Sequence, residues 1–342
     1  MRRQTIRLAV AALWSLLCMQ MGCTMSDTLP AGEGNDPKET CYPVTFAPLT
    51  IDEGGEEQTR AARPLPSGKL RLMVYGAYDN IKEAAPKANL LYTVTAGVLT
   101  LDPDQEPLEL PAGEYRFYAL APSDKLAPEK GVTGATIGHG DDPLASRTPV
   151  TISTQAVYVM LNPLTHKTSR VEFVVSRGEK AAFTELGQPK EMILYSQTND
   201  PVAFTLGEEG GELPIPGQAE LDTVRMDCFE PVADAVQTFR AERLVLPRPL
   251  SDFIVSIRTE IDKGDGKGPQ ECTLRGKVYS RMFDPGRYYH FSLRVNDPAE
   301  GGDIVLLVTD WNGFGWEDNT GGTGSYITVG HWDKITYNDD IG

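Results

Sequence analysis

The apolar residues of this chain lie in short segments in which apolar and polar positions alternate, and glycine or proline interrupts each segment. Alternation with a period of two places the apolar side chains on one face of an extended strand. The 33 glycines and 25 prolines among 342 residues supply turns between such strands and disfavour long helices. Short strands with frequent turns predict an all-β architecture.

The first of these segments lies within Cys41–Arg63, CYPVTFAPLTIDEGGEEQTRAAR. Tyr42, Val44 and Phe46 share one face of a strand, in which Pro43 indicates a strand start or a sheet edge. An acidic, glycine-containing link with two arginines follows. A strand joined to the rest by an exposed link is one that a protease could release. The alternative is an ordinary first strand followed by a loop.

The other strands are predicted on the same grounds. Leu90–Leu101 is long enough for a hairpin that turns near Ala96-Gly97. One short helix is expected at Glu179–Leu186, and Ser123–Arg147 is expected to be a polar loop with a solvated His139. Strands are expected at residues 69–78, 108–121, 150–152, 157–161, 171–175, 191–196, 203–206, 238–246, 253–261, 271–279, 288–295, 303–311 and 326–329.

Residues 1–22 are predicted to be a lipoprotein signal peptide. Three arginines precede the apolar run Leu8–Leu17, which is too short to span a bilayer comfortably. In Met21-Gly22-Cys23 a small residue directly precedes the cysteine, as the lipoprotein signal peptidase requires. We therefore expect Cys23 to carry the lipid and residues 23–40 to form a flexible tether. Gln20 stands where leucine is commonest, so a plain secretory signal is the alternative.

Composition limits the classes of function. The leader contains three arginines and no acidic residue, so its removal changes the formal charge from −16 to −19. Such an acidic chain lacks the basic footprint that nucleic acid requires. Besides Cys23, the exported chain keeps Cys41, Cys228 and Cys272, with no CxxC spacing of a metal or redox site. We predict no cofactor and no metal; a Cys228–Cys272 disulfide and free thiols are both compatible with the sequence.

The middle of the chain contains the strongest catalytic candidates. Asn162–Val175, NPLTHKTSRVEFVV, places His166 close to Ser169 and Arg170. A serine nucleophile also needs an orienting group and an oxyanion site, and no G-x-S-x-G elbow is present. We interpret His166 as a hydrogen-bonded linker residue and predict that the protein is not an enzyme.

Length suggests about two domains once the leader is removed. The turn-into-strand segments Pro111–Phe117 and Pro285–Phe291 occupy corresponding places late in each half. They indicate two similar β-sandwich domains, at residues 41–165 and 166–342.

Four features follow one another along the chain: the lipoprotein leader, LPAGEYRFYAL at 110–120, LNPLTHKTSRVEFVV at 161–175, and FDPGRYYHFSLRV followed by DIVLLVTDWNGFGW at 283–316. In this order they resemble the fimbrillin family, the lipoprotein-derived subunits of Gram-negative surface fimbriae. The resemblance implies two tandem transthyretin-like β-sandwiches. It also implies a precursor that reaches the outer membrane, where an Arg-specific protease removes the first strand. The groove that remains then accepts a strand from the next subunit.

Carried onto this sequence, the resemblance makes Arg60-Ala61 the expected cleavage site. Arg63 is less favourable because Pro64 follows it. The C-terminal tail, 325–337, is the expected donor strand, although it could instead pair within its own domain. Its expected anchors are Tyr326, Ile327, Val329, Trp332 and Ile335.

These features predict a structural or adhesive subunit of a cell-surface fimbria at the outer membrane. Its expected partners are other fimbrial subunits, joined by β-strand addition, and a host or bacterial surface receptor or glycan. A non-polymerising anchor or tip subunit is one alternative. Another is a lipid-anchored glycan-binding protein that presents the rings of Trp311 and Trp316, although core packing also explains these tryptophans.

Overall fold

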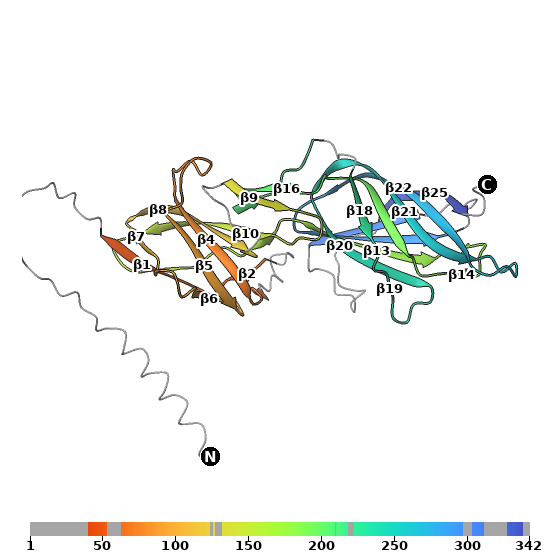
Figure 1. The fold of residues 1–342 in the computed structure, drawn as a ribbon, viewed down its shortest axis with the longest axis horizontal. Coiled ribbons are helices and arrows are strands. Elements are labelled where there is room, and N and C mark those ends of the chain that lie inside the picture. The colour runs from red at the N-terminus through yellow and green to blue at the C-terminus, as the bar shows by residue number, and fades with distance from the viewer. Residues whose placement is uncertain are drawn as a thin grey trace, which may run out of the picture. The chain divides into compact units, whose positions relative to one another are not determined.

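A computed structural model describes residues 40–52, 63–123, 126, 132–208, 210–217, 222–296, 303–310 and 327–337 (Figure 1). Every regular element in these ranges is a β-strand, which confirms the predicted all-β class. The described part of the chain contains no helix long and apolar enough to cross a membrane.

The first half is a sandwich of two sheets. Alternate apolar residues of both sheets face each other in one core, which includes Val44 and Leu110 from the smaller sheet and Leu72, Val74 and Phe117 from the larger one. The smaller sheet has the order β11 (Val157–Val159), β1 (Cys41–Phe46) and β7 (Glu109–Pro111). The larger sheet has the order β12 (Thr165–His166), β10 (Leu144–Ile152), β8 (Gly113–Ala121), β4 (Gly68–Gly76), β5 (Ala88–Thr95) and β6 (Val98–Leu101). A short pair, β2 (Thr50–Ile51) with β3 (Arg63–Pro64), completes this half.

The second half is one sheet of eleven strands that encloses its own core. Strands near opposite ends of the sheet order, β18 and β20, contact each other, so the sheet closes over the apolar side chains on its inner face. The order is β18 (Asp222–Met226), β15 (Glu191–Gln197), β21 (Arg248–Asp262), β22 (Gln270–Phe283), β25 (Ile327–Tyr337), β24 (Asp303–Asp310), β23 (Arg287–Val295), β13 (Ser169–Arg177), β20 (Thr238–Val245) and β19 (Glu230–Pro231), with β14 (Glu185–Leu186) paired to β21.

A third sheet joins the two halves. It has the order β17 (Gly210–Glu212), β16 (Val202–Gly207) and β9 (Val132–Ile137), and Figure 1 shows β9 beside β16. Its own apolar cluster includes Met73, Tyr75 and Tyr118 from the first half and Phe204 and Leu206 from the second. The predicted boundary between residues 165 and 166 falls inside β12, while β9, from the predicted first domain, pairs with β16 of the second.

Three local predictions are wrong. Residues 179–186 form turns and the short strand β14, because Glu185 and Leu186 pair with Asp262 and Ile261 of β21. The expected loop 123–147 contains β9 and the start of β10. Its His139 is partly buried rather than solvated, since Nε2 lies 2.9 Å from the Thr198 carbonyl and the Leu246 amide donates to Nδ1.

Candidate functional site: the first strand

β1 changes its hydrogen-bonded neighbour halfway along its length. Cys41–Pro43 pairs antiparallel with β7, whereas Val44–Phe46 pairs parallel with β11. The Val44 amide still donates to the Leu108 carbonyl at 2.9 Å, and the Ala47 amide donates to the Val159 carbonyl at 2.9 Å. β1 is therefore the middle strand of its sheet, and Pro43 lies inside it rather than at a start or an edge.

The side chains of this segment fill the first core. Val44, Leu49 and Ile51 are almost fully buried, with exposed fractions of 6%, 1% and 7%. Phe46 packs edge-on against Tyr92, with 5.8 Å between the ring centroids. Removal of residues 41–51 would therefore open an apolar groove between β7 and β11.

Residues 49–52 are bound by backbone hydrogen bonds to three other segments. The Leu49 amide donates to Gly97 in the β5–β6 turn, the Leu65 amide donates to Leu49, and the Asp52 amide donates to Leu164. Gly97 has a φ of +81°, and a Cβ at this position would lie 2.7 Å from the Leu49 carbonyl oxygen. Only glycine fits this turn against the segment.

In the sequence, the predicted processing site falls between β2 and β3. Thr50 pairs with Pro64 and Ile51 with Arg63, so these two strands flank the link 53–62. Arg63 is part of a strand, whereas Arg60 and Ala61 lie outside the described residues, as does the lipidation candidate Cys23. Cleavage after Arg60 would separate β1 and β2 from β3 and the rest of the chain.

The predicted donor tail lies within the second half. β25, which contains Ile327, Val329, Trp332 and Ile335, pairs antiparallel with both β22 and β24. Tyr326 lies outside the described residues, and so do the glycan candidates Trp311 and Trp316.

The catalytic candidates near the junction bind different partners. His166 is 8% exposed, and its Nδ1 lies 2.7 Å from Asp142 Oδ1, which confirms its interpretation as a hydrogen-bonded residue. Ser169 Oγ instead donates to the Asp284 carbonyl at 2.8 Å. The described residues contain no group of three or more His, Cys, Asp or Glu side chains that could hold a metal ion. Cys228 and Cys272 are free thiols, so they form no disulfide with each other.

β13 and β23 share a buried charged cluster that the alternation of apolar and polar residues does not predict. Glu172, which is 2% exposed, accepts hydrogen bonds at Oε2 from Tyr288 (2.5 Å) and His290 (2.6 Å). Burial alone would raise the pKa of Glu172, but these hydrogen bonds outweigh it and hold the pKa below its ordinary value. The alternation of Val171 and Phe173 predicts an outward Glu172, and no sequence signal marks its side of the sheet as buried.

The sequence profile of the fimbrillin-like family matches residues 91–320 of this chain. The chain belongs to this family. The structure of a fimbrial protein from Bacteroides vulgatus is similar to this fimbrillin-like chain, with a TM-score of 0.50 and 10% sequence identity. The match covers 80% of this chain and 99% of the other. The structure of a candidate cell adhesion protein from Bacteroides uniformis has a TM-score of 0.50 and 15% sequence identity, and its match covers 82% of this chain and 100% of the other.

The C-terminally truncated tip fimbrial protein Mfa3 from Porphyromonas gingivalis is 10% identical, with a TM-score of 0.45, over 80% of this chain and 100% of its own. No curated protein gives a match in sequence. The two structures with a TM-score of 0.50 show a shared fold, while family membership supports a fimbrial or adhesive subunit at the cell surface rather than an enzyme.

Proposed function

We propose that this fimbrillin-like protein is a fimbrial subunit that is exported as a lipoprotein and assembles by strand exchange after loss of its first strand. The pairing of β1 carries this proposal. β1 is the middle strand of a three-stranded sheet, yet its only covalent link to the rest of the fold passes through the arginine-containing segment 53–62.

Loss of β1 would leave backbone amides and carbonyls of β7 and β11 without partners beside an apolar groove. Both are costly to leave open, since each unpaired buried group costs about 1–3 kcal/mol. A strand from a second molecule would restore the hydrogen bonds and refill the pockets of Val44, Leu49 and Ile51. Because donor and acceptor surfaces differ, the contact is heterologous and builds a filament.

The C-terminal tail remains our proposed donor. In the single chain β25 has partners on both edges, so donation requires it to leave β22 and β24. The extended groove of a neighbour would compensate for the bonds lost there. A subunit that kept its tail and its first strand would act as an anchor or a tip.

Limited proteolysis tests the proposal. Treatment of the lipid-free protein with an Arg-specific protease should produce a chain that starts at Ala61 and forms a ladder of oligomers on a denaturing gel run without boiling. Arg60→Lys keeps the charge but removes the cleavage site, so it should stay monomeric. Arg63→Lys is the matched control and should be processed like the wild type. A chain that is cut at Ala61 and stays monomeric would contradict strand exchange.

A further inference from the structure

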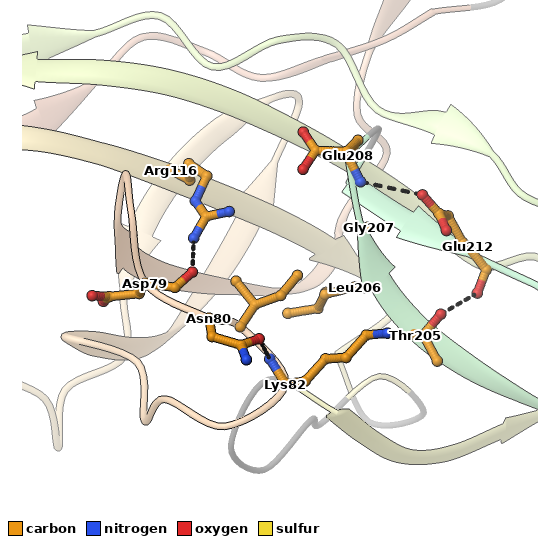
Figure 2. Close-up of a pocket in the computed structure, with 10 residues that line it drawn as sticks. Asp79, Asn80, Lys82, Arg116, Thr205, Leu206, Gly207, Glu208 and Glu212 are labelled. Carbon is orange, nitrogen blue, oxygen red and sulfur yellow. Dashed lines mark hydrogen bonds between the residues drawn. The ribbon is translucent and has the colours of Figure 1, made fainter.

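A cavity of about 520 Å³ opens where the β4–β5 loop and β8 face the β16–β17 hairpin (Figure 2). This volume falls within the range of small-molecule sites. Asp79, Asn80 and Lys82 line it from the loop, Arg116 from β8, and Glu208 and Glu212 from the hairpin. Ile81 and Leu206 add apolar surface. The first strand and the C-terminal tail contribute nothing to this cavity among the described residues.

Arg116 is held in a fixed orientation without an acidic partner. Its Nη2 donates to the carbonyls of Gly76 (3.2 Å) and Asp79, and its Nε donates to Gly76 at 3.3 Å. Nη1 makes no hydrogen bond, and no carboxylate forms an ion pair with Arg116 within the described residues. A guanidinium that is already immobilised loses little entropy when it binds a carboxylate.

The acidic groups around Arg116 have other partners. Asp79 Oδ2 accepts from the Gly76 amide at 2.8 Å, and Glu212 Oε1 accepts from the Glu208 amide at 3.2 Å. Glu208 forms an ion pair with Arg147. Lys82, by contrast, is exposed, and its amine has no partner in the described part of the chain. Arg116 and Lys82, two cations without acidic partners, thus line the same cavity.

An exposed aromatic ring belongs to the same loop. Tyr78 is 92% exposed, and its hydroxyl donates to Glu114 Oε2 at 2.9 Å. Glu114 and Arg116 are two residues apart on β8, so both side chains lie on the same face of the strand. The hydrogen bond therefore holds the Tyr78 hydroxyl on the face of β8 that carries Arg116, and Tyr78 lies next to Asp79 in the loop without itself lining the cavity.

From these contacts we propose that the cavity binds a carboxylated sugar. The carboxylate would pair with Arg116 Nη1 and the Lys82 amine, and the Tyr78 ring would offer an apolar face to the sugar ring. Asn80, Thr205 and the accepting oxygens of Asp79 and Glu212 suit the hydroxyl groups. This alternation of donors and acceptors favours a saccharide over an acidic peptide, which has few hydroxyl groups. The proposal goes beyond assembly and does not depend on it.

Calorimetric titration of the uncleaved monomer tests this site, so the result is separate from strand exchange. The probes are two matched pairs: trigalacturonic acid with its methyl ester, and sialyllactose with its methyl ester. At least one acidic sugar should bind about tenfold more tightly than its neutral counterpart. Arg116→Gln should weaken this binding about tenfold, and the exposed-residue variants Lys82→Gln and Tyr78→Ala about threefold each.

Lys267→Gln is the matched control, because it removes a charge from the β21–β22 loop, outside the cavity, and should bind like the wild type. Lys82→Gln and Tyr78→Ala keep the test valid if Arg116→Gln disturbs the loop that it holds. The proposal is overturned if neither acidic sugar binds, if acidic and neutral sugars bind equally, or if a hexaglutamate peptide competes as well as the sugar. Unchanged binding by both exposed-residue variants would also overturn it.

Discussion

β1 in the first half and β13 in the second each have one parallel and one antiparallel neighbour, but the lengths over which they pair differ. β1 is parallel to β11 and antiparallel to β7, and β13 is parallel to β23 and antiparallel to β20. β13 pairs with both neighbours along nearly all of its length, whereas each half of β1 pairs with only one.

This difference determines how much buried structure the loss of each strand would expose. β13 buries Val171 and Phe173 on one face and Glu172 on the other, so its loss would disrupt both faces of the sheet. β1 buries its side chains on one face only, where Val44 joins Leu49 and Ile51 of the following segment in the first core. Loss of β1 would therefore expose one apolar face, whereas loss of β13 would disrupt both faces of its sheet.

The largest expected effect is in β13. Phe173 is fully buried and stacks on Phe291, with 4.7 Å between the ring centroids. Phe173→Ala should lower the free energy of unfolding of the second half by about 3–5 kcal/mol. Urea unfolding followed by tryptophan fluorescence measures this half alone, because after leader removal every tryptophan lies beyond residue 310. Phe173→Leu should cost much less; an equal loss would contradict the packing argument.

The acid sensitivity of β13 is the next expected effect. The folded pKa of Glu172 lies below its ordinary value, so its contribution is present above about pH 4.3 and is lost as the pH falls through the lowered folded pKa. Glu172→Gln should cost about 2 kcal/mol at pH 7. Its unfolding free energy should also fall less between pH 5 and pH 3 than that of the wild type. A parallel decline in both proteins would show that other groups cause the acid sensitivity.

A smaller effect is expected for β1. Val44→Ala should destabilise the first half by about 2 kcal/mol, because one buried valine side chain loses its contacts. The tryptophan transition should not move, whereas the far-ultraviolet circular dichroism signal should show earlier loss of structure. Thr45→Ala is the control on the exposed face of β1. A shift of the tryptophan transition in Val44→Ala would show that the halves unfold together.

The smallest expected effect concerns His139, in the loop between β9 and β10. His139 accepts the Leu246 amide at Nδ1, so only a neutral ring with its proton on Nε2 fits this position. Burial lowers the pKa of His139 below 6.5, so its contribution is present above that pH and is lost as the pH falls through the folded pKa. Lowering the pH from 7.5 to 5.5 should cost about 1 kcal/mol, and His139→Gln should remove this dependence. Thermal unfolding at the two pH values measures it, and an unchanged dependence in the variant would contradict this assignment.

Local sequence predicts the hairpins well. The turn near Ala96-Gly97 is confirmed, and both residues have positive φ angles, 47° and 81°. The strands on each side of the loop 263–269 are also where alternation and turn residues place them. Such elements depend on neighbours in the sequence, which a pattern can reveal.

Elements that depend on partners far away in the chain could not be predicted from the sequence. β9, VTGATI, has few large apolar residues and becomes a strand by pairing with β16, far along the chain. His139 also binds residues far along the chain, Thr198 and Leu246, so its local sequence predicts a solvated side chain. The cavity around Arg116 also draws on both halves, so no motif could indicate it.

The pairing of β9 with β16 has a mechanical consequence. A fimbria under fluid flow transmits tension along each subunit, and here the covalent connection between the halves is reinforced by a backbone ladder. The two halves could not separate under tension until the hydrogen bonds between β9 and β16 ruptured. Stretching one molecule should therefore give a rupture event before either half extends, and this event should disappear when a proline at Ala203 breaks the ladder.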